Sequence, residues 1–283
     1  MASGGERDGA SAATSTRFAD AKGTVARTLE IIQCFGGSQV EWALGDLAST
    51  VNLPRSTVHR LLGLMQQDGF VEADLKTRRY RPGPELYRIG ATLAANMPII
   101  PLAMPILHDI ARRSDETTLL SLFYPKQLQK AFVAQVESSR SMRYVIELNV
   151  RGSMLWGASA HAILAFLDEP TIRRALADRE TSPSTGARAN RRALARELTR
   201  IRAEGYARSV GERVPTAIGL AVPVFGADGL VKGSLSVTYP DSRMDEAHNR
   251  TLIILLRDGA RALSTALGWD ADKADNVYRL INF

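Results

Sequence analysis

Cysteine and histidine are scarce in this chain of 283 residues. The single cysteine, Cys34, excludes an internal disulfide, and such scarcity is typical of a protein that stays in the reducing cytoplasm. The four histidines are scattered, and none has a neighbour at the spacing of a metal site (His59, His108, His161 and His248). We therefore expect a cytoplasmic protein that holds neither a disulfide nor a metal ion.

Long hydrophobic runs and glycine-rich phosphate loops are missing as well. No apolar run reaches the length of about 20 residues that a membrane-spanning helix needs. Residues 1–23 are rich in Ala, Ser, Gly and Thr and lack the apolar core of a signal peptide, so we expect a disordered tail there. Neither a dinucleotide-binding fingerprint nor a phosphate-cradling glycine loop occurs. We therefore expect no membrane partner and no cofactor.

Positive charge is in excess, but its distribution along the sequence does not identify a binding surface. The formal net charge is +6, which permits a polyanionic partner. Residues 24–90 nevertheless hold eight Lys or Arg against seven Asp or Glu, a net charge of about +1. More of the excess lies between Arg173 and Arg213, and we interpret its arginine-rich stretch up to Arg202 as a solvated helix face. A binding surface therefore has to be located from individual side chains.

The first ninety residues predict three short helices followed by a hairpin. Val25, Leu29 and Ile32 recur at helical spacing, and the glycine pair at 36–37 ends this helix. "WALGDLASTVNL" predicts a second helix, and Pro54 suits the first turn of a third helix that ends at Gly69. "FVEA" and "RRYRP" flank the turn "DLKT" and predict a two-stranded hairpin.

The third of these helices carries an unusual polar face. Its apolar seam consists of Val58, Leu61, Leu62 and Met65. The opposite strip runs through Ser56, Arg60, Gly63 and Gln67, with hydroxyl, arginine and glycine in place of the usual Lys and Glu. We interpret this strip as a surface that lies against a partner rather than against water.

The remaining chain alternates strands and helices. A helix leads away from residue 84, and we expect Pro98, Pro101 and Pro105 to break up a domain junction near residues 95–105. Three segments read as strands ("TTLLSLFY", "KAFVAQVE" and "MRYVIEL"), and two as helices ("ASAHAILAFL" and "NRRALARELTRIRAEG"). A hairpin around Asp228-Gly229 and a long closing helix follow. This order predicts an α+β fold with a sheet covered by helices.

The pattern resembles the IclR family of bacterial transcriptional regulators. The resemblance is carried by "LGDLASTVNLPRSTVHRLLGLMQQDGFVE" and "RRYRPGPELYRIG" in the first part, and by "GASAHAILAFL" and "AVPVFGADGLVKGSLSVTYP" in the second. It implies a winged helix-turn-helix over residues 24–84, a linker helix over 85–100, and a GAF/PAS-like α+β sensor domain over 101–268. Residues 269–283 remain as a C-terminal tail. The resemblance also implies a homodimer or homotetramer that binds double-stranded operator DNA under the control of a small-molecule effector.

A recognition helix enters the major groove of DNA with its N-terminus first. In that geometry Ser56 and Thr57 meet phosphate, and Arg60 reaches a guanine edge or a phosphate. The alternative is that both hydroxyls merely cap the helix while Arg60 faces water. The other expected contacts come from the recognition helix, the wing and the first helix (Arg55, His59, Lys76, Arg78, Arg79 and Arg27), whereas Arg81 points inward or pairs with an acid.

For the sensor, the resemblance places an effector pocket under the "GAS" turn. Backbone N–H groups of Gly157, Ala158 and Ser159 would form an anion site for a carboxylate, and Glu212, Ser236 and Thr238 match polar positions of the family. Ser236 and Thr238 share one strand face, but hydrogen bonding inside the core is an equal alternative for both. The chain departs from the family at Ala160-His161, and Met154 and Trp156 would add an apolar wall that favours an aromatic or bulky acid.

Two other functions compete with a ligand-responsive regulator. "GASAH" loosely resembles a nucleophile elbow around Ser159, but the second glycine is missing and His161 follows too closely, so we expect no enzyme. The alternative within the regulator class is a DNA-binding protein whose second domain only oligomerises and binds no effector. Whether any small molecule changes operator affinity or melting temperature separates these two regulators.

Overall fold

The structure is a computed structural model that describes residues 23–36, 39–95 and 99–270. The predicted tails therefore lie outside the described residues, apart from Gly23, Trp269 and Asp270, and so does Pro98. The chain divides into two compact units, residues 1–93 and 94–283, which are treated separately below.

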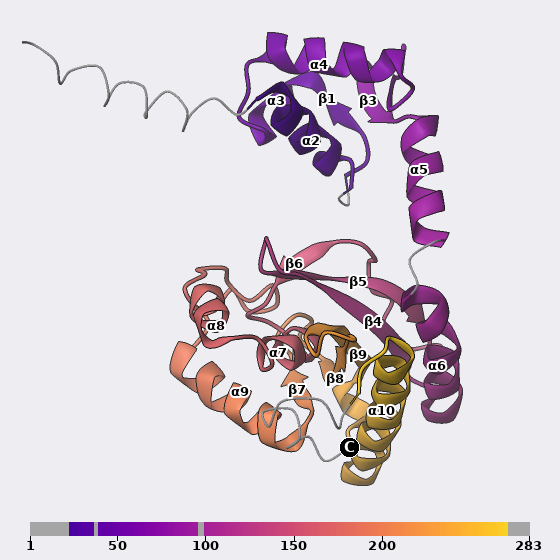
Figure 1. Cartoon of the computed structure of the whole chain (residues 1–283), viewed down its shortest axis with the longest axis vertical. Helices are drawn as coiled ribbons and strands as arrows, with labels where there is room; N and C mark the ends of the chain where they lie inside the picture. Colours follow the sequence, from indigo (N-terminus) through magenta and orange to yellow (C-terminus); the bar gives the residue numbers. More distant parts are fainter. Residues whose placement is uncertain (1–22, 37–38, 96–98, 271–283) are drawn as a thin grey trace, which may run out of the picture. The chain divides into compact units, whose positions relative to one another are not determined.

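Before residue 84, the described part of the first unit contains three helices and a small antiparallel sheet (Figure 1). Its helices are α2 (Thr24–Cys34), α3 (Leu44–Thr50) and α4 (Arg55–Gln67). The predicted seam of α4 is buried, and it packs on Leu47 and Ala48 of α3 and on Ile31 and Phe35 from the α2 region. Val25 and Leu29, expected on the apolar face of α2, are instead 73% and 52% exposed. The core of this unit is therefore small and centred on α4.

The wing has one more strand than the sequence indicated. The sheet has the order β1-β3-β2, with β1 (Trp42–Ala43) paired to β3 (Arg79–Pro82) beside β2 (Val71–Ala73). The second helix accordingly begins at Leu44, because Trp42 and Ala43 belong to the sheet. A strand of two residues has no periodicity of its own, and only its pairing with β3 defines it.

Two helices follow the wing, namely α5 (Pro84–Ala95) and α6 (Ile99–Ser114). The prediction that Pro101 and Pro105 break up the junction is wrong, since both lie inside α6. Pro101 occupies the first turn, where no N–H bond is required. Pro105 removes one intrahelical hydrogen bond, but the buried face through Ala103, Leu107 and Ile110 holds the helix against the sheet.

The second unit is built on one antiparallel sheet of six strands in the order β6-β5-β4-β9-β8-β7. The strands are β4 (Thr117–Tyr124), β5 (Gln129–Val136), β6 (Arg151–Ser153), β7 (Ala207–Val210), β8 (Ala217–Phe225) and β9 (Val231–Pro240). Turn Asp228-Gly229 joins β8 to β9 as predicted, and Gly229 has a positive φ of 73°. The two central strands, β4 and β9, were both predicted from the sequence.

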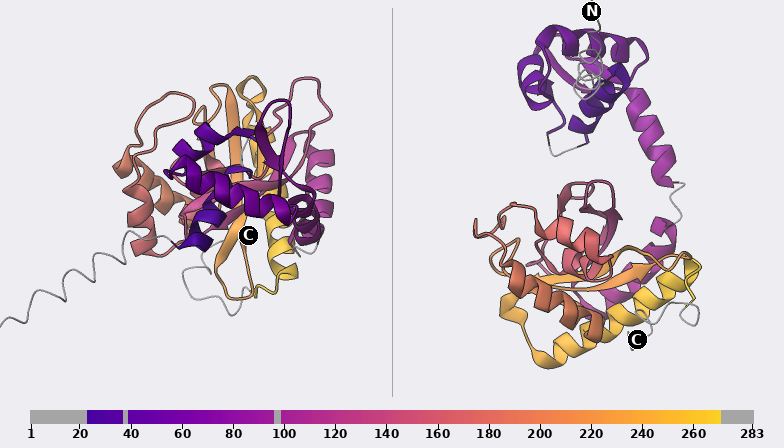
Figure 2. Two further views of the ribbon diagram at one scale, coloured as in Figure 1. Left: turned by 90° about the horizontal axis from the view of Figure 1, so that it is seen from above. Right: turned by 60° about the vertical axis from the view of Figure 1, so that its left-hand side comes forward.

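Helices cover both faces of this sheet (Figures 1 and 2). Helices α6 and α10 (Glu246–Ala266) lie side by side on one face and bury an aliphatic core against β8 and β9. On the other face α7 (Ala158–Leu164) contacts β8 and β9, and α8 (Glu169–Leu176) and α9 (Arg191–Glu204) lie outside it. Trp269, which had no predicted role, stacks on Phe225 at 5.5 Å between ring centroids. These layers confirm the predicted α+β fold.

Besides α6, further elements of the second unit were missed, and one segment was predicted wrongly. The segment "MRYVIEL" at 142–148 is not a strand, whereas β6, β7 and α8 were not predicted. The side chain of Gln135 accepts the backbone N–H of Ile146 at 3.1 Å, so a side chain rather than a strand ladder pairs this part of the segment. Val145, Ile146 and Glu147 of this segment line a cavity instead, and no pattern in the sequence distinguishes such a segment from a strand.

Candidate functional site

The polar strip of α4 is free of intramolecular contacts along its length. Ser56, His59 and Arg60 are exposed, and within the described residues no side-chain hydrogen bond or ion pair involves them. The seam on the opposite side is at most 6% exposed. The α4 strip (Ser56, Arg60, Gly63 and Gln67) therefore has no structural partner in the part of the chain that the structure describes.

The start of α4 does not use side-chain caps. Pro54 occupies the N-cap position, and neither Ser56 nor Thr57 caps the helix. The backbone N–H of Thr57 bonds to the carbonyl of Pro54 at 2.9 Å. The capping alternative for the two hydroxyls therefore does not hold. Arg55 is placed differently, because its guanidinium packs over Gly45 of α3, where a Cβ would lie 2.8 Å from Nη2.

The wing presents its basic residues at a tight turn. The carboxylate of Asp74 accepts the backbone N–H groups of Lys76 and Thr77 at 2.7 and 3.0 Å, which shapes the turn and lowers the pKa of Asp74. Lys76, Arg78 and Arg79 are exposed there. Arg81 instead pairs with Glu72 at 2.9 Å, one of the two outcomes expected for it. Arg27, on α2, is half-buried.

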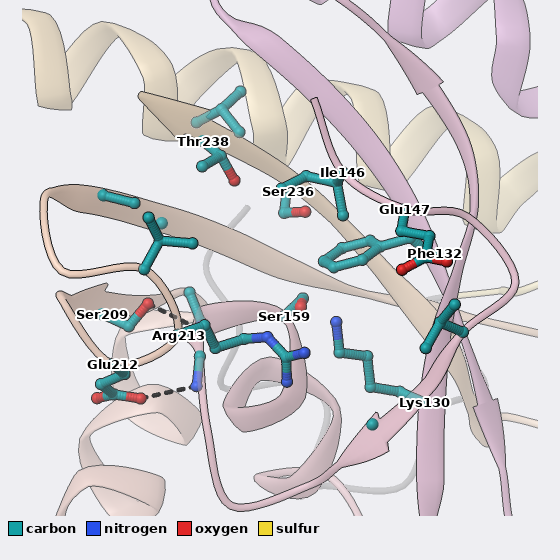
Figure 3. A pocket seen from close by; sticks show the side chains of 18 of the residues that line it. Lys130, Phe132, Ile146, Glu147, Ser159, Ser209, Glu212, Arg213, Ser236 and Thr238 are labelled. Carbon is teal, nitrogen blue, oxygen red and sulfur yellow. Dashed lines mark hydrogen bonds between the residues drawn. The ribbon is translucent and has the colours of Figure 1, made fainter. Parts of the chain in front are cut away.

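A cavity of about 250 Å³ lies on the α7 face of the large sheet (Figure 3). Strands β5, β8 and β9 supply one wall, and the start of α7, residues 145–150 and the β7–β8 connection supply the rest. Its volume is slightly below the range of roughly 300–1,000 Å³ of drug-sized ligand sites, which suits a metabolite. The cavity brings together Gly157, Ala158, Ser159, Glu212, Ser236 and Thr238, the predicted effector residues apart from two.

Two of the three backbone N–H groups at the "GAS" turn already have acceptors (Figure 3). Gly157 donates to the Glu212 carboxylate at 2.7 Å, and Ala158 donates to the Ser209 hydroxyl at 2.9 Å. The carboxylate of Glu212 thus occupies the place where we expected the carboxylate of an effector. The short helix α7 therefore does not offer the open anion site that was expected at its N-terminus.

Unpartnered polar groups occur elsewhere in the cavity. Ser236 is only 3% exposed, and its Oγ has no hydrogen-bond partner among the described residues. The alternative that this hydroxyl is satisfied within the core therefore does not hold. Lys130 is 2% exposed, and its Nζ lies 3.3 Å from the centre of the Phe132 ring. A buried polar group without a partner usually costs free energy, so these groups need an explanation that the fold alone does not give.

Lys130 and Arg213 were not among the predicted site residues. Lys130 is the second residue of β5 and its one charged residue, which was the only sequence signal that it faces a binding site. Arg213 directly follows Glu212 in a connection without periodicity. Its side chain lies over two glycines, since a Cβ at Gly157 would be 3.0 Å from Cδ and one at Gly152 would be 3.1 Å from Nη1. Because these two glycines have no Cβ, the side chain of Arg213 has room to lie over them.

Met154 and Trp156 do not line the cavity. Met154 is 1% exposed and Trp156 is 9% exposed, and both pack into the hydrophobic cluster around α7 and α9. The indole Nε1 of Trp156 donates to the carbonyl of Glu180 at 3.3 Å. The structure thus separates these two residues from the other predicted effector residues, and Phe132 supplies the aromatic surface instead.

The serine and histidine of "GASAH" are not joined by a hydrogen bond. His161 Nε2 contacts the carbonyl of Leu155 at 2.9 Å, and the ring is 4% exposed. The backbone carbonyl of Ser159 accepts from Ser234 Oγ at 3.2 Å.

Among the described residues no group of His, Cys, Asp or Glu is placed to hold a metal ion. No helix in the described ranges is long and apolar enough to cross a membrane.

Two family models match this chain. The model described as IclR helix-turn-helix domain matches residues 24–75, and the one described as bacterial transcriptional regulator IclR C-terminal matches residues 91–265. Together these matches cover α2 to β2 and most of the second unit. The second match alone spans more than half of the chain.

Individual relatives and solved structures agree with the family models. The chain is 26% identical to the transcriptional regulator XynR of Escherichia coli, over 88% of this chain and 98% of that protein. It is 25% identical to the transcriptional regulator TtgV of Pseudomonas putida, over 88% of this chain and 93% of that protein. An IclR-type structure from Silicibacter superposes with a TM-score of 0.81 at 29% identity, covering 90% of this chain and 99% of that one.

A more distant structure shares the fold and was solved with a ligand. It is an IclR homologue from Microbacterium hydrocarbonoxydans in complex with 4-hydroxybenzoate, with a TM-score of 0.73. At 21% identity it covers 87% of this chain and 99% of that chain. These relatives are transcriptional regulators rather than enzymes.

Proposed function

Because this chain belongs to the IclR family of bacterial transcriptional regulators, we propose that it binds operator DNA under the control of a small organic acid. The proposal keeps the division expected from the sequence: DNA binding by residues 24–84, linkage by 85–100 and ligand binding by 101–268. The change between compact units after residue 93 supports this division. We also propose a homodimer or homotetramer, because two recognition helices must match two half-sites on the duplex.

The DNA contacts that we propose come from the α4 strip and the wing. The α4 strip supports this assignment, because its side chains stabilise no other part of the first unit. Arg60 would read a base edge, whereas wing cations would contact phosphates and add salt dependence. The near-neutral charge of residues 24–90 means that affinity depends on where these side chains lie. Arg55, packed on Gly45, would have to leave α3 to reach DNA.

Arg60→Ala is expected to weaken specific operator binding by about 1–3 kcal/mol, the value of one bidentate base contact. Arg60 is exposed and has no intramolecular contact to lose, so the fold should be unaffected. Fluorescence anisotropy on an operator fragment selected by the protein from random-sequence DNA measures the loss. Gln66→Ala, an exposed residue of the same helix outside the α4 strip, is the matched control. Unchanged operator affinity in Arg60→Ala would remove this residue from the interface.

Gly63→Ala is expected to stabilise the first unit and to weaken operator binding at the same time. A Cβ at Gly63 meets nothing within 4 Å, and alanine favours a helix interior over glycine by about 0.5–1 kcal/mol. The added methyl group nevertheless stands on the α4 strip, where DNA would approach closely. Thermal unfolding and anisotropy separate the two effects. Tighter or equal operator binding in the more stable variant would argue against close approach at Gly63.

The effector site that we propose is the cavity on the α7 face. The observation that carries this proposal is the buried Ser236 hydroxyl, which lines the cavity and lacks a hydrogen-bond partner among the described residues. A carboxylate oxygen would accept from it, while Phe132 and Val150 would cover the carbon skeleton. The homologue with bound 4-hydroxybenzoate supports an organic acid as the ligand class. The favoured class is therefore a small carboxylate, and an aromatic ring fits beside Phe132.

A melting-temperature screen of aliphatic and aromatic acids tests the sensor role. A ligand present at about 100 times its Kd stabilises the unit that binds it by about 2.7 kcal/mol. The same acid should change operator affinity in the anisotropy assay. If no acid changes either quantity, the second unit only oligomerises, which is the competing function for this fold.

A further inference from the structure

Two positively charged side chains face each other in the cavity (Figure 3). Lys130 projects from β5, and Arg213 projects from the β7–β8 connection, so the two charges come from opposite walls. Within the described residues, neither forms a hydrogen bond or an ion pair. Burial lowers the pKa of Lys130 well below its ordinary value, and the charge of Arg213 lowers it further. The folded protein thus keeps Lys130 beside an arginine whose charge disfavours protonation of the lysine.

The acids around the cavity do not neutralise this pair. Glu212 is engaged by the N–H of Gly157 and lies 3.8 Å from His161 Nε2, on the side away from Lys130. Glu147 is exposed at the rim and forms no ion pair with Lys130. Desolvation lowers the pKa of Arg213, and the only acid that opposes this shift is Glu180, which does not line the cavity. The positive charge is therefore left for a ligand to compensate.

We propose that the ligand of this cavity is a small dicarboxylate, with one carboxylate on Lys130 and the other on Arg213. This inference rests on the proposed function of the cavity as the effector site and specifies its ligand class. Two separated cations on opposite walls match two separated anionic groups better than one. Arginine binds a carboxylate through two parallel hydrogen bonds, and lysine binds one as a point charge. Ser236 then donates to one of the ligand oxygens.

Binding of a dicarboxylate should change the protonation of Lys130. A ligand carboxylate beside Lys130 favours the charged ammonium and raises its lowered pKa, so the complex takes up a proton. Dicarboxylate affinity should then fall as the pH rises above the pKa of Lys130 in the free protein. The other ionisable groups at the cavity are Arg213 and Glu212 in the β7–β8 connection and Glu147 before β6. Glu212 is engaged by the N–H of Gly157, and Glu147 is exposed at the rim, so the uptake should depend on Lys130.

The test compares acids that share one carbon skeleton. Isothermal titration of the full-length protein with benzoate, phthalate and phenyl phosphate varies the number and separation of charges on one aromatic ring. Butyrate and succinate give the same comparison of one and two carboxylates on an aliphatic chain. We expect each dicarboxylate to bind about 10- to 100-fold more tightly than its monocarboxylate, the range for one additional charge-assisted hydrogen bond. Phenyl phosphate, with both charges on one group, should bind less tightly than phthalate. Titrations in two buffers of different ionisation enthalpy measure the proton uptake.

Variants assign the two charges. Lys130→Met and Arg213→Met should each remove most of the dicarboxylate preference while monocarboxylates still bind, and Lys130→Met should also abolish the proton uptake. Lys126→Met removes a neighbouring exposed cation outside the cavity and should change neither quantity. Equal affinity for benzoate and phthalate, or a preference for phenyl phosphate, would overturn the dicarboxylate assignment alone. If no acid binds to the parent protein, the sensor role fails and this inference fails with it.

Discussion

Arg243→Ala is expected to destabilise the second unit by about 3–5 kcal/mol, the largest effect that the structure predicts. Glu116, just before β4, is completely buried, and Arg243 in η1 (Asp241–Arg243) donates to it from Nε at 2.9 Å and also from Nη2. Removal of the guanidinium leaves this carboxylate with His248, 3.4 Å away, as its remaining ion-pair partner. Differential scanning calorimetry should show a fall in melting temperature of roughly 6–20 °C for a unit of this size.

A second variant separates the ion pair from packing. Replacing both partners, with Glu116→Gln and Arg243→Met, leaves no charge buried alone and should recover much of the loss. Arg250→Ala is the surface control, since its pair with Glu246 is 3.9 Å long and both side chains are mostly exposed. If Arg243→Ala were as mild as Arg250→Ala, the buried pair would not be a major contributor to stability.

Gly233→Ala is expected to cost about 3 kcal/mol, the upper part of the range for overpacking in a core. Gly233 lies in β9, opposite Leu122 of β4 and Val224 of β8. A Cβ there would stand 1.9 Å from the carbonyl oxygen of Ser121, and this neighbour is backbone in a central strand. The strands β4 and β9 therefore have to separate locally. Urea unfolding of the second unit measures the cost.

Ligand binding gives this prediction a second readout. Ser236 follows on the same strand, so displacement of β9 should also weaken binding of whichever acid the parent protein accepts. Gly90→Ala is the control, because a Cβ in that part of α5 meets nothing within 4 Å, and the change should be neutral or stabilising. A Gly233→Ala variant as stable as the parent would show that the sheet yields easily at this position.

Local sequence patterns determined the elements that we propose to bind DNA. The seam of α4 was predicted residue by residue, because a helix against a core repeats its buried positions at a fixed spacing. The β8–β9 hairpin follows from Asp228-Gly229, and α9 ends at Gly205 in a left-handed conformation as its sequence predicted. The proposed DNA-contact residues stay predictions, but the placement of Ser56 and Arg60 on one exposed face of α4 was readable from spacing alone.

Tertiary structure decided which of the expected residues line the cavity and which unexpected ones join them. Met154 and Trp156 are adjacent to the "GAS" turn in sequence, yet packing directs them into the core. Lys130 and Arg213 are far apart in the chain, and only the curled sheet and the β7–β8 connection bring them together. The ion pair of Glu116 and Arg243 spans 127 positions. Sequence periodicity reports which side of an element is buried, whereas the partner of a buried charge depends on contacts between distant segments.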